Sequence, residues 1–289
     1  MSGPEPTNTR GGIRVAASMN SSPTDAAQEL KAGLLDIDIE HLIIFFSAEF
    51  DTQAVTAAIS TAFPGVSFSG CSTAGEISPL GMTQGGTIAI AFPRDSFRVH
   101  SGSIDNIQQS GVESANETAR KLLTQLKAVK SGHAFNNSFA LLFIDGLSNY
   151  EEMIVAAINW EIGDIQLVGG SAGDNLAFNK TSLIHNGEVK RQAVILLLIE
   201  TDVPFQVFKS QNFDPTPTKL VVTKADTVNR IVYELNAEPA AREYADAIGL
   251  LPDDLGPFSF ASYPLVVKVG GSYYCRSIRN MNPDGTKER

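Results

Sequence analysis

The chain has 289 residues, of which 43% are hydrophobic and 19% charged, with a net charge of −10; this predicts about two globular domains. The acidity argues against nucleic acid and anionic membranes as partners, and two cysteines suit a reducing cytosol rather than a disulfide framework. No apolar run reaches the roughly 18 residues of a membrane helix, so we expect a cytoplasmic protein with no membrane contact.

The first part of the chain alternates predicted strands and helices. Residues 1–12 are rich in Pro, Gly, Thr and Asn, and we expect them to be disordered. The apolar run 42–46 predicts a strand covered on both faces. A helix capped by Asp51 follows, and a second strand begins at Val66.

A second series of elements begins near Phe139. A helix is predicted over 116–129 ahead of it, and Ser148 with Glu151 has the spacing of a capping box for the next helix. Asn186-Gly187 between two extended runs predicts a hairpin.

Two short glycine motifs stand at equivalent points of these series. Residues 70–76 read GCSTAGE and residues 169–174 read GGSAGD, each after an apolar run and each with an acid at its end. We interpret each as a tight turn of small residues that allows positive φ angles and close backbone approach. Exposed backbone N–H groups beside such a turn can hold a ligand.

The similarity extends beyond the motifs. A shift of 99 positions aligns some thirty residues of the two series without a gap, for example Leu42 with Leu141 and Gly70 with Gly169. We interpret this as a duplication of one unit, about 41–92 and 139–199. The predicted fold is therefore α/β: duplicated β-α-β-turn-β units form mixed sheets covered by helices. If the two copies face each other, their glycine corners border one shared hollow.

The composition changes after residue 225. A strand over 230–235, a helix over 239–250 and a strand over 258–269 are predicted, followed by a polar tail. These elements indicate a short α+β lobe at 226–289. It is small for a self-sufficient core and is incomplete if the chain has been truncated.

The two motifs supply the candidate ligand-binding residues. We expect Gly70, Cys71, Ser72, Ala74, Gly75 and Glu76 from the first motif, and Gly169, Gly170, Ser171, Gly173 and Asp174 from the second. The turns could equally serve close packing, and each acid could simply accept hydrogen bonds from its own turn. Cys71 has no Lys, Arg or His within ten residues, so a buried thiol is favoured over a nucleophile.

The motifs together resemble the FIST family of bacterial sensory domains. The resemblance rests on GCSTAGEI, GGSAGD, HNG at 185–187, VVTKAD at 221–226, EPAAREYA at 238–245 and YPLVVKVGGSYYCRSI at 263–278. It implies a FIST N-terminal-type domain at 13–225, a partial C-terminal-type domain at 226–289, and a ligand-binding sensor without catalytic activity. The chain is most similar to nitric-oxide-sensing haem proteins of the family. These are the relatives that regulate histidine kinases or cyclic-di-GMP enzymes.

Haem needs an axial ligand, usually histidine. The chain has four, His41, His100, His133 and His185, and His100 in a predicted strand is our candidate. No CxxCH sequence is present, so haem would bind without covalent attachment, and no spacing typical of a metal site occurs. Two alternatives stay open: a sensor of a small polar ligand such as an amino acid, and an enzyme using Cys71 or the paired acids.

Overall fold

The structure is a computed structural model, and it describes residues 7–8, 11–79, 81–128, 135–175, 177, 179–210, 212–227, 229–281 and 287–288. The segment 1–12, expected to be disordered, lies largely outside these residues. The chain divides into two compact units, Met1–Phe208 and Lys209–Arg289. The division after Phe208 lies closer to the N-terminus than the domain boundary that we predict at residue 225. Each unit is described by itself.

Two large sheets make up most of the strands described in the first unit. The larger has the order β1-β2-β7-β3-β4-β11-β12 and the smaller has the order β10-β9-β13-β8. The strands of the larger sheet are β1 (Thr7–Asn8), β2 (Arg14–Ser18), β3 (Ile39–Ser47), β4 (Ser67–Thr73), β7 (Thr87–Pro93), β11 (Leu183–His185) and β12 (Glu188–Lys190). Those of the smaller are β8 (Phe97–Ile104), β9 (Asn137–Asp145), β10 (Gln166–Ala172) and β13 (Val194–Thr201).

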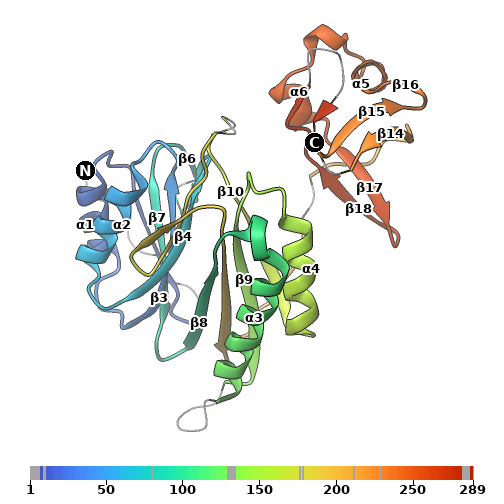
Figure 1. Cartoon of the computed structure of the whole chain (residues 1–289). Helices are drawn as coiled ribbons and strands as arrows, with labels where there is room; N and C mark the ends of the chain where they lie inside the picture. The colour runs from blue at the N-terminus through green and yellow to red at the C-terminus, as the bar shows by residue number, and fades with distance from the viewer. Residues whose placement is uncertain are drawn as a thin grey trace. The chain divides into compact units, whose positions relative to one another are not determined.

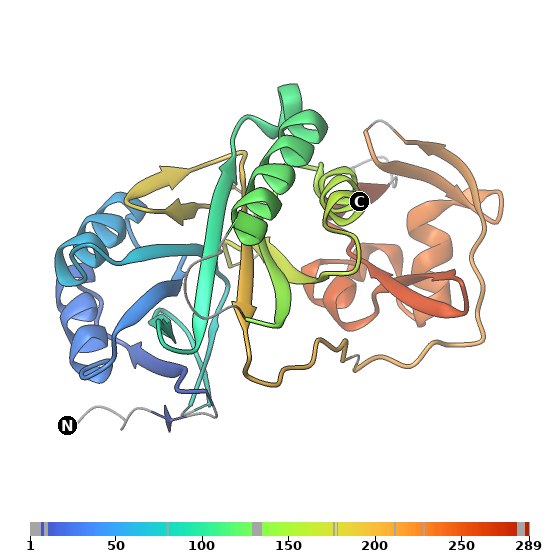
Figure 2. The same cartoon turned by 90° about the horizontal axis from the view of Figure 1, so that it is seen from below.

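Three apolar clusters stack these sheets into four layers. One cluster joins the larger sheet to α1 (Pro23–Gly33) and α2 (Thr52–Ala62). A second joins the smaller sheet to α3 (Ile107–Ala128) and α4 (Glu151–Ile162). A third lies between the sheets and includes Ile43, Phe143 and Leu197. The unit is therefore helix–sheet–sheet–helix, with α1 and α2 on one side of the strands and α3 and α4 on the other (Figures 1 and 2).

The coordinates confirm the duplication. The elements β3, α2 and β4 recur as β9, α4 and β10, and a shift of 99 carries Ser67–Thr73 onto Gln166–Ala172. In both copies the two strands are parallel neighbours, so the helix is a crossover between them. An α/β fold with mixed sheets and covering helices is therefore confirmed.

Some local predictions were wrong. The helix α4 has Tyr150 at its N-cap and no side-chain cap, because the Ser148 hydroxyl accepts instead from the Tyr150 N–H at 3.3 Å. The helix α3 begins at Ile107, ahead of the predicted start at 116. Residues 74–86 hold a small hairpin, β5 (Glu76–Ser78) and β6 (Gly81–Thr83).

The second unit has a small core of its own, which includes Leu235, Tyr244 and Phe260. One sheet holds β14 (Val222–Asp226), β15 (Ile231–Leu235), β16 (Glu238–Pro239), β19 (Asn280–Met281) and β20 (Lys287–Glu288), and a hairpin holds β17 (Leu265–Val269) and β18 (Ser272–Arg276). The helical elements are α5 (Ala240–Ile248), the 3-10 turn Pro252–Asp254 and α6 (Pro257–Ser262). The helix α6 replaces half of the strand predicted over 258–269. The Gly256 N–H donates to the Ser259 hydroxyl at 2.9 Å and fixes its first turn.

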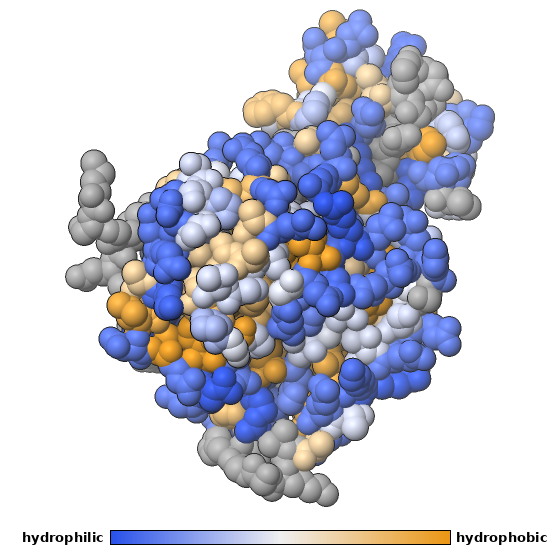
Figure 3. Space-filling view, turned by 60° about the vertical axis from the view of Figure 1, so that its left-hand side comes forward, coloured by the Kyte–Doolittle hydropathy of each residue, from blue (hydrophilic) through white to orange (hydrophobic). Residues whose placement is uncertain are grey.

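The surface is mostly hydrophilic on the face drawn in Figure 3, with hydrophobic patches between the charged regions. Several large apolar side chains are strongly exposed, among them Ile77, Met82 and Trp160. Among the described residues, no helix combines the length and the apolar character needed to cross a membrane.

Candidate functional site

The two glycine motifs begin inside strands, which corrects their interpretation as tight turns. Residues 70–73 end β4, and residues 169–172 end β10. None of the motif glycines is among the described residues with positive φ. Gly70 and Gly169 serve close approach instead: a Cβ at Gly70 would overlap the carbonyl oxygen of Ile44, and one at Gly169 that of Leu142. The requirement for glycine is thus explained by strand packing.

The ends of the motifs meet across the two sheets. The Ser72 hydroxyl donates to the Gly173 carbonyl oxygen at 2.8 Å, and the Gly173 N–H donates to the Ser72 carbonyl oxygen at 2.9 Å. The Ser182 N–H donates to the Ser72 hydroxyl at 3.1 Å. The structure therefore brings these predicted site residues together, but as a direct hydrogen-bonded contact. The hollow expected between the two motifs stays a prediction, and the depression described below is lined by other residues.

The two motif acids hold loops. The buried carboxylate of Glu76 accepts from the Thr73 hydroxyl at 2.7 Å and from the Gly86 N–H at 3.1 Å. The Asp174 carboxylate accepts from the N–H groups of Asn179 at 2.5 Å and Lys180 at 2.9 Å. These bonds agree with the simpler of the two interpretations for the acids. Ligand binding by the motif residues stays a prediction.

The thiol of Cys71 faces the apolar cluster between the sheets and is 4% exposed. Burial raises its pKa to about 12, because the low-dielectric surroundings disfavour the thiolate. A nucleophile must be the thiolate near neutral pH, so this environment does not favour an enzyme using Cys71.

The candidate haem ligand His100 lies on β8, on the face covered by α3, since Gly102 on the same face packs against Thr118 of that helix. Its Nε2 atom is 3.1 Å from a carboxylate oxygen of Glu200. The Arg98 guanidinium lies 3.8 Å from the same carboxylate.

Two further histidines share one buried hydroxyl. His41 Nε2 lies 3.1 Å from the Ser69 Oγ, and His185 Nδ1 lies 3.0 Å from the same oxygen. The other nitrogen of His41 bonds to the Ser67 Oγ at 2.7 Å. Burial, and then the nearby His185, lower the pKa of His41 to about 3, and burial also lowers that of His185. The sequence analysis missed this series of hydrogen-bonded side chains, although the alternation of Ser67 and Ser69 along one strand is a signal for it.

Haem binding stays a prediction, and the three described histidines differ in their availability as ligands. Both ring nitrogens of His41 and of His185 bond to neighbouring side chains. His100 bonds to Glu200 through Nε2, and a carboxylate on one ring nitrogen is common for a histidine that ligates a metal through the other. His133 lies outside the described residues. No group of three or more His, Cys, Asp or Glu that could hold a metal ion occurs in the described part of the chain.

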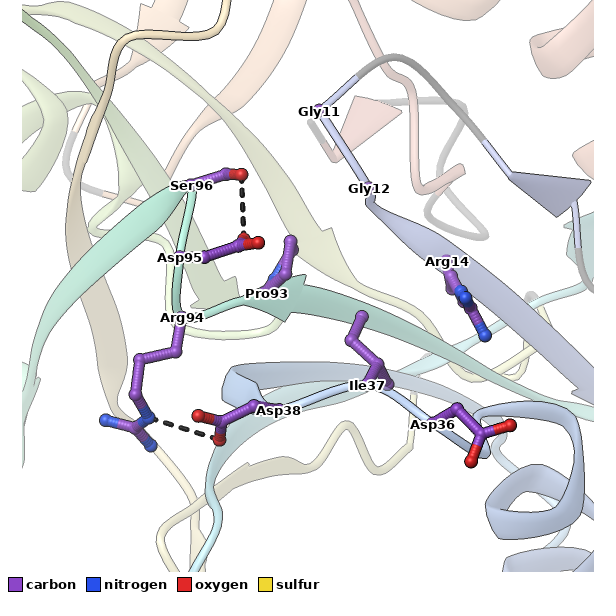
Figure 4. A pocket seen from close by; sticks show the side chains of 10 residues that line it. All are labelled: Gly11, Gly12, Arg14, Asp36, Ile37, Asp38, Pro93, Arg94, Asp95 and Ser96. Atoms are coloured by element: carbon purple, nitrogen blue, oxygen red, sulfur yellow. Dashed lines mark hydrogen bonds and ion pairs between the residues drawn. The ribbon is translucent and has the colours of Figure 1, made fainter.

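A depression of about 510 Å³ lies at the start of β2, away from the glycine motifs. Its lining residues come from three segments of the chain: Gly11, Gly12, Arg14, Asp36, Ile37, Asp38, Pro93, Arg94, Asp95 and Ser96. Figure 4 shows Arg14 and Asp36 on one side and Asp95 on the other, with Ile37 and Pro93 between them. No sequence motif marked this site, because its residues are far apart in the chain.

The charges of the depression are not equivalent. Arg94 is held by Asp38 at 3.3 Å and by Glu40 at 2.7 Å. Arg14 instead donates to the Leu35 carbonyl oxygen at 2.8 Å, a neutral acceptor. Arg14 is therefore the cation best able to meet an added anion.

Comparison with known proteins agrees with the architecture. Residues 41–238, more than half of the chain, match the FIST N domain. The chain belongs to the FIST family. FIST domains are sensory domains of signal transduction and not catalysts.

One curated relative of this FIST chain is an uncharacterized protein of Methanocaldococcus jannaschii, 25% identical over 181 residues. The match covers 62% of the FIST chain and 34% of the relative. The chain thus spans about a third of the length of the curated relative that it matches.

Proposed function

We propose that this FIST chain is a sensor of a small zwitterionic ligand of the amino-acid class, bound in the depression of Figure 4. The observation that carries the proposal is the arrangement of one cation, Arg14, and two carboxylates, Asp36 and Asp95, around the apolar side chains of Ile37 and Pro93. An α-amino acid has one carboxylate and one ammonium group close together, so it needs a cation and an acid on neighbouring walls.

The chemistry of each wall supports this ligand class. The planar guanidinium of Arg14 uses Nη1 on the Leu35 carbonyl and keeps further donors for a carboxylate. Asp36 or Asp95 would accept from the ammonium group; Asp95 now accepts from the Ser96 hydroxyl at 2.8 Å. Ile37 and Pro93 supply apolar contact for a short side chain.

Titration calorimetry and thermal unfolding of the purified chain with each of the common amino acids test the proposal. A ligand that binds only the native state raises the melting temperature, and the rise continues with the logarithm of the ligand concentration above Kd. We expect Arg14→Ala to abolish that shift, and Arg191→Ala, at an exposed arginine elsewhere, to leave it unchanged. Absence of any shift across the panel would exclude this ligand class.

The resemblance to nitric-oxide sensors makes haem the alternative ligand, and a histidine kinase or cyclic-di-GMP enzyme the proposed partner in either case. Among the described histidines, His100 is the candidate axial ligand, with Nε2 bonded to Glu200. Titration with haem decides: a saturable Soret band supports the alternative, and an unchanged free-haem spectrum removes it. The amino-acid proposal is tested by a thermal shift and the haem alternative by an absorbance band, so either hypothesis can be rejected without the other.

A further inference from the structure

The two copies of the repeated unit differ in one respect: β4 is covered and β10 is not. Residues Phe68 to Ser72 are all buried, whereas the equivalent residues Leu167 to Ser171 are half-buried or exposed. The helices show the same contrast, since Thr56 of α2 is 4% exposed and its equivalent Val155 of α4 is 38% exposed.

The cover in the first copy is a short antiparallel hairpin. Its strand β11 pairs with β4, setting Leu183 against Cys71 and Ile184 against Gly70, and both Leu183 and Ile184 are fully buried. The second copy has no such strand among the described residues, where β10 pairs only with β9. Its outer backbone edge is therefore open along residues 166–171, up to the buried Ala172 at the end of the strand.

Nothing in β10 protects this edge. Natural proteins usually protect edge strands with charged residues, prolines or bulges, because an open edge pairs with other chains. The edge strand β8 carries Arg98 and His100, and the edge strand β12 carries Glu188 and Lys190. The sequence of β10, QLVGGSA, has no charge and no proline, and its register with β9 is regular throughout.

We infer that β10 pairs with β10 of a second copy of this chain, antiparallel and about a two-fold axis at Gly169. The axis would join the two smaller sheets into one continuous sheet. It places Val168 opposite Gly170 of the second copy, on the same face of the sheet.

This pairing is self-complementary in shape. Val168 is 40% exposed, and nothing lies within 4 Å of the position that a Cβ would take at Gly170. Opposed residues of an antiparallel pair have Cβ positions about 5 Å apart, so the valine of one copy fills the open space beside the glycine of the other. The strand itself carries no charge, whereas acids flank it at both ends: the axis sets Asp164 of one copy opposite Asp174 of the other, outside the paired strands.

Light scattering after size exclusion tests the inference on the full chain. We expect the mass to be twice 30.9 kDa at micromolar concentrations. Val168→Lys places a charge on the strand, as natural edges do, and should return the mass to that of one chain. Met82→Lys, at a residue 89% exposed on the β5–β6 hairpin, is the matched control and should leave the dimer intact.

A crosslink keeps the inference testable if Val168→Lys fails to fold, which circular dichroism would reveal. In a Cys275→Ser background, which removes the exposed thiol, Val168→Cys with Gly170→Cys should form a covalent dimer on oxidation. The single variant Val168→Cys should form much less. A wild-type chain that is monomeric, a dimer that survives a folded Val168→Lys variant, or a double-cysteine variant that does not crosslink would overturn the inference.

Discussion

Ser72 and Gly173 are 101 residues apart in sequence and exchange two hydrogen bonds, one through the serine hydroxyl and one through its carbonyl oxygen. The pair joins the end of β4 in one sheet to the segment after β10 in the other. The two copies of the repeat are thus connected where their glycine motifs end.

Removal of the Ser72 hydroxyl should destabilise the first unit. Ser72→Ala leaves the Gly173 carbonyl and the Ser182 N–H without this partner in a buried place. We expect the free energy of unfolding to fall by about 1–3 kcal/mol in urea titrations. Ser171→Ala, the equivalent and exposed position of the second copy, should change it by less than about 0.5 kcal/mol. Equal effects of the two substitutions would contradict the asymmetry.

Alanine substitutions should distinguish neighbouring glycines of one motif. Gly169→Ala forces a Cβ onto the Leu142 carbonyl, and overpacking of this kind costs about 1–3 kcal/mol or more. Gly170→Ala meets open space and should be neutral or slightly stabilising, since alanine loses less backbone entropy than glycine on folding. Thermal unfolding of both variants compares them. A Gly170→Ala variant as unstable as Gly169→Ala would show that the strand is placed wrongly.

Acid should destabilise the fold through His41. Its folded pKa of about 3 lies below the unfolded value of 6.5, so the unfolded chain binds the proton first as pH falls. Stability is therefore complete above pH 6.5 and declines progressively as the pH falls toward about 3. This one group should contribute a slope of about 1.4 kcal/mol per pH unit within that window. Urea unfolding of the wild type and of His41→Asn over this range should show a shallower slope for the variant, and identical slopes would refute the assignment.

The two cysteines should differ sharply in reactivity. Cys71 is buried and its pKa is raised to about 12, whereas Cys275 is exposed. Iodoacetamide at mildly alkaline pH should therefore add once to the native chain and twice in denaturant, by intact mass. Native labelling of Cys71 at the rate seen for Cys275 would mean that the thiol is open to solvent, and the enzyme hypothesis would need to be revived.

The sequence was sufficient for the repeat and for the fold class. Two strands joined by a helix keep the same apolar spacing in both copies. A gap-free alignment with a shift of 99 residues therefore pairs strands that the structure also places at equivalent positions. Local signals were less dependable. Ser148 precedes α4 and Glu151 is its first residue, as in a capping box, yet the Ser148 hydroxyl accepts from the Tyr150 N–H. Such bonds compete at short range with nearly equal energies, and the sequence pattern does not distinguish them.

Only the tertiary structure decided what the motif residues do. Glycine is used both in turns and where two backbones pack closely, and the sequence is the same in both cases. The position of the Ile44 carbonyl beside Gly70 is a property of the assembled sheet. The same holds for the depression around Arg14 and for the open edge of β10, which depend on segments that are distant in the chain. Periodicity along the chain records which residues are buried, whereas contacts between separate strands and loops arise only when the layers pack.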